Sequence, residues 1–286
     1  MSDTWPYRWD LLLRYRFIEV IALWEGRLTT RHLVETFGIG RQQASKDINT
    51  YNREVGLGNL VYNKYIKGYE PSPRFQPQVT RGLSEEYLQL LAQRSEMHRT
   101  FSNVALPLSQ TEVLAPPMRP VSPDVLRPLL LAAREQQRIE VDYVSLNNPD
   151  REGRIIAPHT LVWTGLRWHV RGWCEKNRDF RDFVLSRFRG VPELLGPAEH
   201  NVRDDSDWNT FIDLHLIPDP RLSPDQQAVI ADDYGMTNNQ LALNIRARLL
   251  SYLLQLLNIN AGTPLSDARA QQVIIANREE ISPWVL

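Results

Sequence analysis

The sequence predicts a multidomain α+β fold. In the first third of the chain, apolar residues recur at helical spacing and glycines separate the helical segments. After Arg138 the pattern changes to the alternation of short antiparallel strands, and the last third mixes strand and helix patterns. With 286 residues the chain is long enough for two or three domains, each with its own core.

Composition narrows the class of protein. The chain is 42% apolar and 23% charged, as globular proteins are. It has no run of about 18 apolar residues and no basic, apolar leader, so we expect neither a membrane partner nor a secretory signal. Cys174 is the only cysteine, which excludes an intrachain disulfide and fits a reducing compartment. These features predict a cytoplasmic protein.

Charge is distributed unevenly, although the net charge is only −1. Residues 151–190 contain nine Arg and Lys against four Asp and Glu, whereas residues 201–286 contain six against eleven. A basic middle and an acidic end indicate modules with different partners.

Two helices are expected before residue 40. The first spans about residues 8–25 and ends at Gly26, because glycine is favoured just past a helix end. The second is capped by Thr29 or Thr30, and Gly38 and Gly40 allow a tight turn after it. The apolar sides that would share one core are Leu11, Tyr15, Ile18 and Ala22 in the first helix and Leu33, Val34 and Phe37 in the second.

The third helix, over residues 41–55, is the most informative segment. Its apolar stripe is Ala44, Ile48, Tyr51 and Val55, at helical spacing. The opposite face carries side chains of the kinds that pair with guanine, adenine and phosphate. The candidates for DNA contact on this helix are Arg41, Gln42, Gln43, Ser45, Lys46, Asn49 and Arg53.

A short β-hairpin over residues 60–69 follows, with Lys64 and Lys67 near its tip. Three helices and a basic hairpin make a winged helix-turn-helix, whose third helix enters the major groove of double-stranded DNA while the wing follows the backbone. The two lysines would hold phosphate. We assign residues 1–78 to this DNA-binding domain; the alternative is a solvated helix face in a scaffold that binds protein.

The middle of the chain is predicted to be a helical linker followed by a β domain. The linker covers residues 79–124, with a helix over 83–99 and a proline-rich segment after it. Ser122 or Asp124 opens a further helix to about residue 137. Strands are expected over residues 139–145, 151–161, 167–175 and 180–188, as in a small antiparallel barrel spanning 125–200.

Cations alternate along these strands. Arg167, His169 and Arg171 have the same parity, so they should converge on one side of the sheet. A face rich in Arg, His, Ser and Tyr suits a polyanionic ligand, such as a nucleotide or single-stranded nucleic acid. An ordinary solvated sheet face is the alternative.

Four ordered segments of this β domain resemble the WYL domain of bacterial transcription regulators. They contain Tyr143 and Ser145, then His159, then Trp168 to Arg171, and finally Arg181 and Arg187. The resemblance implies an Sm/SH3-like β-barrel whose basic groove binds a nucleotide or nucleic-acid effector. The groove would be formed by Ser145, His159, Arg171, Arg181 and Arg187, with Tyr143 and His169 as second-rank candidates. The chain departs from the family at its naming triplet, which here is Trp168-His169-Val170 instead of Trp-Tyr-Leu.

A small α/β module is expected over residues 201–286. It has strands over 212–217 and 241–246, a helix capped by Ser223 or Asp225, and a leucine-rich helix over 247–257. That last helix is too apolar for one buried side, which indicates a central core helix or a subunit contact. WYL-domain regulators use this extension in dimerisation, so the resemblance favours the subunit contact.

The resemblance extends to domain order and looks particularly like the short dimeric WYL repressors found beside phage-defence operons, the BrxR/CapW-like type. It implies a homodimeric repressor that binds a pseudo-palindromic operator and is controlled by an anionic effector. No phosphate-binding glycine loop, metal-ligand spacing or nucleophile elbow is present, so we expect no cofactor, no metal and no enzyme activity. The alternative is an accessory protein that binds single-stranded nucleic acid for a partner enzyme.

Overall fold

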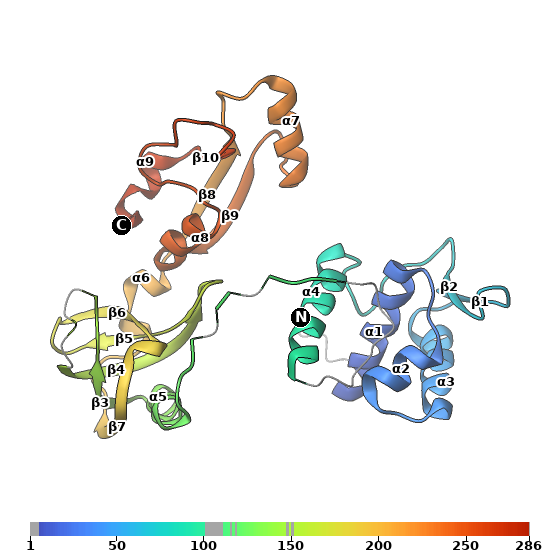
Figure 1. Cartoon of the computed structure of the whole chain (residues 1–286), viewed down its shortest axis with the longest axis horizontal. Coiled ribbons are helices and arrows are strands. Elements are labelled where there is room, and N and C mark those ends of the chain that lie inside the picture. Colours follow the sequence, from blue (N-terminus) through green and yellow to red (C-terminus); the bar gives the residue numbers. More distant parts are fainter. Residues whose placement is uncertain are drawn as a thin grey trace. The chain divides into compact units, whose positions relative to one another are not determined.

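The computed structural model describes residues 6–100, 111–114, 116–117, 119–146, 149 and 152–285. The chain forms two compact units, residues 1–115 and 116–286, and each is considered by itself (Figure 1). The predicted linker falls partly outside the described residues, at 101–110, 115 and 118. Within the described residues, no helix has the length and apolar character that crossing a membrane requires.

The first unit begins with three helices in the predicted order. They are α1 (Trp9–Glu25), α2 (Thr30–Phe37) and α3 (Arg41–Thr50), which continues as the π-helical turn η1 (Tyr51–Val55). Gly26 and Gly38 end the first two helices with φ angles of 67° and 63°, a conformation that glycine adopts without strain. The buried residues of the shared core include Tyr15, Ile18, Ala22, Leu33, Ala44, Ile48 and Tyr51, as the apolar stripes predict.

The predicted wing is a two-stranded antiparallel hairpin, β1 (Leu60–Asn63) and β2 (Gly68–Pro71). A bridge between Leu28 and Tyr69 ties it to the segment between α1 and α2. The helix α4 (Ser84–Thr100) then packs against α1 through Leu91, which is buried, and through a hydrogen bond from the Tyr87 hydroxyl to Glu25. The winged helix-turn-helix fold is therefore confirmed.

The second unit opens with a helix against a five-stranded antiparallel sheet of order β6-β5-β4-β3-β7. The elements are α5 (Pro123–Glu135), β3 (Gln137–Tyr143), β4 (Glu152–Trp163), β5 (Trp168–Cys174), β6 (Asp179–Val184) and β7 (Phe188–Pro197). The Ser122 hydroxyl caps α5, as predicted. Between α5 and the sheet lies a core that includes Leu129, Ile139 and Phe183. Among the described residues no ladder joins β6 to β7, so the sheet is open at that edge.

The fourth predicted strand is in fact two strands. It ends at Val184, and a 3-10 turn, η2 (Leu185–Arg187), leads into β7. The chain bends here, and Phe183 and Phe188 both contact the Tyr143 ring, with centroid distances of 5.1 Å each. One straight strand cannot bring residues five apart to the same side of one ring, since alternate residues face opposite ways.

The C-terminal part of this unit is a three-stranded sheet of order β10-β8-β9 with short helices. It comprises η3 (Val202–Asp204), α6 (Ser206–Asn209), β8 (Phe211–Pro218), α7 (Pro224–Asp233), β9 (Leu241–Arg246), η4 (Ala247–Leu249), α8 (Leu250–Leu256), β10 (Val273–Ile275), α9 (Arg278–Ile281) and η5 (Ser282–Trp284). The pattern did not predict β10, because three residues are too few to show alternation. The α+β fold class is confirmed in all three parts.

The leucine-rich helix begins as a 3-10 turn and lies both in the core and at the surface. Leu250 and Leu254 are buried in the core of the C-terminal module, whereas Leu256 is 54% exposed. The core reading therefore holds for the buried side of this helix, and the subunit contact of its exposed side stays a prediction.

Candidate DNA interface and ligand site

The outward face of α3 is open to solvent. Ala44, Ile48 and Tyr51 are fully buried, which turns the other side of the helix outward. Arg41, Gln42 and Lys46 are exposed there, and no side-chain hydrogen bond or ion pair engages them within the described residues. These three side chains are available for base or phosphate contact.

The other candidates on α3 are held by neighbours. Gln43 is exposed but donates to the buried carboxylate of Asp47 at 2.7 Å, and Asn49 accepts from the Tyr69 hydroxyl at 3.3 Å. Arg53 is paired with Glu54 at 2.6 Å, and Ser45 is half-buried. Their positions are therefore fixed before any partner arrives, a form of preorganisation that reduces the entropy lost on binding.

Asp47 anchors the recognition helix to α1. Its side chain is 4% exposed and accepts from Arg14 Nε at 2.7 Å as well as from Gln43. The wing is anchored in a similar way, because Arg27 Nε donates to the Ile66 carbonyl at 2.7 Å beside the exposed Lys64 and Lys67. Helix and wing thus belong to one rigid domain.

The five-stranded sheet has two faces that differ in what covers them. One, the core face, packs against α5 and includes Val170 and Phe183. The other, the outer face, carries His169 and Arg171 on β5 and Asp182 on β6, since paired residues share a face and Arg171 pairs with Asp182. The predicted convergence of His169 and Arg171 on one side agrees with this register.

The outer face is not open, however, because the C-terminal part of the chain covers it. Arg171 is 1% exposed and forms a two-pronged pair with Asp205, with distances of 2.5 Å (Nε–Oδ2) and 2.8 Å (Nη2–Oδ1). Its third nitrogen donates to Asp182 at 3.1 Å. Such a fork-to-fork pair is the strongest arrangement that an arginine makes with a carboxylate.

Asp205 collects further donors. His159 Nε2 lies 3.1 Å from its Oδ2, and the Trp208 backbone N–H donates to its Oδ1 at 3.1 Å. Burial by itself would raise the pKa of Asp205, but the hydrogen bonds from His159 and Arg171 outweigh it and lower the pKa to about 2. Asp205 is therefore a carboxylate at neutral pH.

Asp182 joins the sheet to the C-terminal module. Its Oδ2 accepts from Arg248 Nε at 3.0 Å and from the Tyr252 hydroxyl at 2.9 Å, while its Oδ1 accepts from Arg171. Burial first and the charge of Asp182 second raise the pKa of Tyr252, which keeps that hydroxyl a donor. We call Arg171, Asp182, Asp205, Arg248 and Tyr252 the ionic cluster.

These contacts correct the predicted ligand groove. Arg171 was expected to offer a free cation, but all of its nitrogens are used by carboxylates. His159, on the bulge between Pro158 and Thr160, is turned toward Asp205 instead of outward. Tyr143 is buried in the core face, where its hydroxyl accepts from the Val184 N–H at 3.1 Å.

His169 is buried, and its Nδ1 has no hydrogen-bond partner among the described residues. Its ring lies against Tyr252, with 5.1 Å between centroids. Burial first, then the charges of Arg167, Arg187 and Arg119, lower the pKa of His169 to about 4, against the opposing effect of Asp182. A neutral imidazole with an unused nitrogen therefore lies in the electrostatic field of three positive charges.

The remaining candidates do not form one group. Arg187 is half-buried in η2 and acts on His169, whereas Arg181 is exposed and pairs with Asp179 at 3.4 Å. Arg181 shares the parity of Phe183, so it lies on the core face at the edge strand, away from Arg171. Ser145 is half-buried just after β3.

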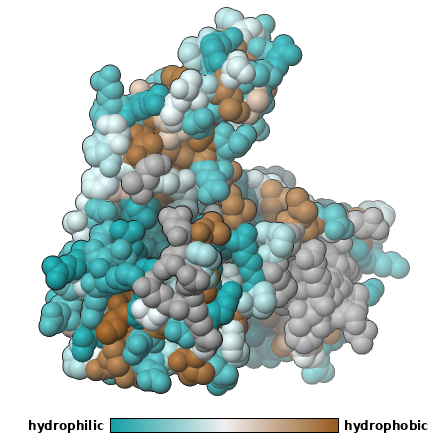
Figure 2. All heavy atoms as spheres, turned by 60° about the vertical axis from the view of Figure 1, so that its left-hand side comes forward, coloured by the Kyte–Doolittle hydropathy of each residue, from teal (hydrophilic) through white to brown (hydrophobic). Residues whose placement is uncertain are grey.

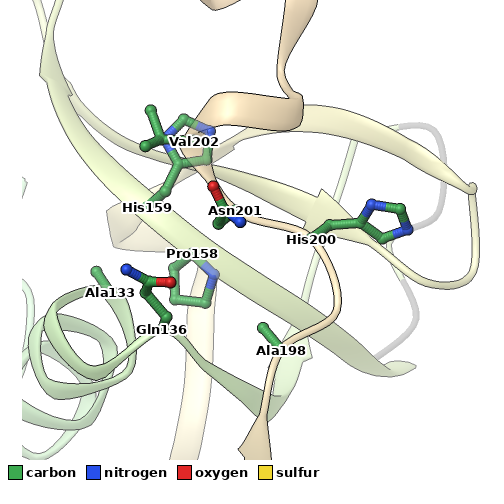
Figure 3. A pocket seen from close by; sticks show the side chains of 8 residues that line it. All are labelled: Ala133, Gln136, Pro158, His159, Ala198, His200, Asn201 and Val202. Carbon is green, nitrogen blue, oxygen red and sulfur yellow. The ribbon is translucent and has the colours of Figure 1, made fainter.

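Among the described residues of this unit, two hollows are large enough to compare with a ligand. A small pocket of about 70 Å³ is lined by residues that include Gln136, Pro158, His159 and Asn201 (Figure 3), which is less room than a nucleotide-sized ligand needs. A larger groove of about 480 Å³ is mainly apolar, and its lining residues are Trp163, Thr164, Gly165, Phe211, Asn244, Ile245, Arg246, Leu249, Tyr252, Leu253 and Leu256. On the face drawn in Figure 2, hydrophilic side chains predominate and hydrophobic side chains gather in patches.

Comparison with known proteins matches three consecutive parts of the chain. Residues 10–93 match the winged helix-turn-helix domain of the BrxR transcriptional regulator, and residues 124–192 match the WYL domain. Residues 211–281 match the C-terminal dimerization domain of the BrxR transcriptional regulator. The fold and these matches define a WYL-domain transcription regulator.

Relatives that match along nearly the whole chain identify the particular family. The chain is 32% identical over 292 residues to the DNA-binding transcriptional repressor CapW of Stenotrophomonas maltophilia, covering 99% of this chain and 95% of that protein. It is 34% identical to CapW of Escherichia coli (strain KTE188), with coverages of 96% and 91%. It is 32% identical to CapW of Pseudomonas aeruginosa, with coverages of 97% and 93%. The chain therefore belongs to the BrxR/CapW-like family of DNA-binding transcriptional repressors.

The family is one of dimerising transcription regulators and not of enzymes, as the sequence predicted. What the sequence reasoning missed is the ionic cluster. Its acidic members, Asp182 and Asp205, lie in short polar segments without local periodicity, so no pattern marks them as buried. Only the spatial meeting of Arg171 with Asp182 and Asp205, 11 and 34 positions away, identifies them.

Proposed function

We propose that this repressor binds a pseudo-palindromic operator of a phage-defence operon as a homodimer, and that an anionic effector at the WYL domain controls it. The observation that carries the DNA-binding part is the exposed, unengaged set Arg41, Gln42 and Lys46 on a helix whose other side is fully buried. Two recognition helices related by twofold symmetry would read two half-sites. The apolar groove at Phe211 and Leu256 offers a surface for the second copy.

The operator experiment replaces the unengaged residues Arg41, Gln42 and Lys46 by Ala. Each base contact contributes about 1–3 kcal/mol, so the triple variant should lose at least about 100-fold in affinity for its upstream DNA in a gel-shift titration. The matched control is Arg134→Ala, an exposed arginine on α5 in the other unit. Unchanged retardation by the triple variant, with the dimer intact in light scattering, would refute the assignment.

For the effector we favour the surroundings of His169. Arg167 lies two residues before it, Arg187 lies three residues after its strand partner Val184, and the charge of Arg119 also acts on its imidazole. Within the described residues no ion pair engages these guanidinium groups, whereas Arg171 is already neutralised. Guanidinium groups near a neutral imidazole suit a phosphate-bearing ligand. Ser145 lies beside this group, because the N–H of the preceding Val144 donates to the Arg187 carbonyl at 3.2 Å. Arg181 is a second-rank candidate because it lies on the other face of the sheet.

The effector experiment uses Arg167→Ala and Arg187→Ala, with a mononucleotide and a short single-stranded oligonucleotide as separate probes. Both variants should retain operator affinity but bind the active probe at least about tenfold more weakly. Equal loss of operator affinity in these variants would make the surface a DNA contact instead of a sensor. If single strands bind more tightly than the upstream duplex in every variant, the accessory-protein alternative is favoured.

A further inference from the structure

The tip of the wing carries an unusually exposed aromatic side chain. Tyr65 is 84% exposed, in the turn between β1 and β2, with Lys64 and Lys67 on either side. Tyrosine presents a large apolar ring with a polar end, a combination that is enriched where proteins bind partners. The turn over residues 64–67 contains no carboxylate, and Glu70 on β2 accepts a hydrogen bond from Asn63, so the tip is complementary to a polyanion.

The backbone under Tyr65 is held in place. The Tyr65 N–H donates to Asn63 Oδ1 at 2.9 Å, and Asn63 Nδ2 donates to Glu70 at 2.9 Å. Arg27 fixes the next carbonyl of the turn, that of Ile66, at 2.7 Å. The tip therefore presents the ring without ordering a loose loop first, which lowers the entropy cost of a contact.

The wing is also connected to the recognition helix. Tyr62 packs edge-on against Tyr69 with 5.4 Å between centroids, and the Tyr69 hydroxyl donates to Asn49 on α3. Tyr62 and Tyr69 are thus occupied within the domain. The only ring or charge contact of Tyr65 among the described residues is Lys64 Nζ, 5.2 Å from its centroid.

We propose that Tyr65 is a specificity-determining DNA contact. Its ring would lie in the minor groove next to the major-groove site of α3. Lys64 and Lys67 would hold the phosphates on the two sides of that groove. The ring would pack on deoxyribose, and its hydroxyl would donate to the N3 or O2 acceptors that A·T pairs present there. A guanine amino group would obstruct this contact, so the wing would select A·T pairs. This inference depends on the proposed operator binding.

The test compares Tyr65→Ala, Tyr65→Phe and Lys67→Ala in operator titrations at several salt concentrations. Tyr65→Ala should lose about tenfold in affinity with an unchanged salt slope, because it removes no phosphate contact. Lys67→Ala should reduce the salt slope by about one. Tyr65→Phe should bind nearly as well as the unaltered protein but lose the preference for A·T under the wing.

Base substitution in the DNA separates the two grooves. Inosine–cytosine pairs keep the minor-groove pattern of A·T but the major-groove pattern of G·C, so the wing should accept inosine–cytosine and reject G·C. Wild-type affinity for Tyr65→Ala, or equal affinity for G·C and inosine–cytosine, would overturn the inference. If the triple variant of α3 binds poorly while Tyr65→Ala binds normally, only the proposed wing contact is refuted. If neither variant changes binding, the proposed operator site fails as well.

Discussion

The α3 face and the outer face of the five-stranded sheet look alike in sequence and differ in space. Both carry basic side chains at regular spacing, yet Arg41 and Lys46 are exposed whereas Arg171 and His169 are each 1% exposed. A surface helix buries one apolar stripe, and the rest of it faces water. A sheet has two faces, and a second module can cover the polar one. Cation spacing on a strand therefore does not by itself indicate an open ligand site.

The contrast between the open α3 face and the covered outer face of the sheet is tested most directly by removing the carboxylate of Asp205. Asp205→Ala leaves Arg171 buried with half of its charge partners gone, which should lower the free energy of unfolding by about 3–5 kcal/mol. Guanidinium unfolding followed by tryptophan fluorescence measures this loss. The matched control, Asp179→Ala, removes a carboxylate that is 59% exposed and paired with Arg181 at the surface of the same sheet, and should cost about 0–1 kcal/mol. Equal effects would mean that the outer face is as open as α3.

Lowering the pH should reduce the free energy of unfolding by a smaller amount. The pKa of His169 is lowered to about 4 in the folded protein, against about 6.5 in an unfolded chain. Between these values the unfolded state binds more protons, so stability is complete above about pH 6.5 and falls as the pH drops toward 4. The loss is roughly 3 kcal/mol at the acid end of this window.

His169→Phe should flatten this pH dependence, because phenylalanine keeps an aromatic ring at this position but has no group that binds a proton. Burial also lowers the pKa of His32 in the winged helix-turn-helix domain, so a residual slope of the same sign is expected in the variant. Denaturant unfolding at pH 4.5, 5.5 and 7 would show it. An identical slope in His169→Phe and the unaltered protein would mean that His169 titrates freely in the folded state.

The smallest effect should come from α3 itself. Lys46→Ala removes an exposed side chain that no side-chain contact engages within the described residues, so thermal or denaturant stability should stay within about 0.5 kcal/mol. Its operator affinity should nevertheless fall. A large loss of stability would show that the α3 face is part of the fold, as the outer face of the sheet is.

Much of the DNA-binding domain was predictable because its determinants are local. The stripe Ala44, Ile48 and Tyr51 identified the buried side of α3, and Gly26 and Gly38 marked two helix ends that the structure shows in the left-handed conformation. The wing turn between Asn63 and Gly68 also lies where the pattern placed it. Only part of the candidate ligand site was predictable. The alternation of residues along β5 correctly put His169 and Arg171 on one face. That Arg181 lies on the other face follows only from the register between β5 and β6.

The sequence by itself determined the order of the modules and the resemblance to WYL-domain repressors. It also determined the buried helix faces of the winged helix-turn-helix domain and the four strand regions of the WYL domain. These follow from periodicity and turn chemistry, which act between neighbours in the chain. The tertiary structure decided which cations are free. Arg171 is neutralised by Asp182 and Asp205, and Asp182 is held in turn by Arg248 and Tyr252, 66 and 70 positions away. Electrostatic pairing depends on distance in space, and no spacing along one strand encodes it.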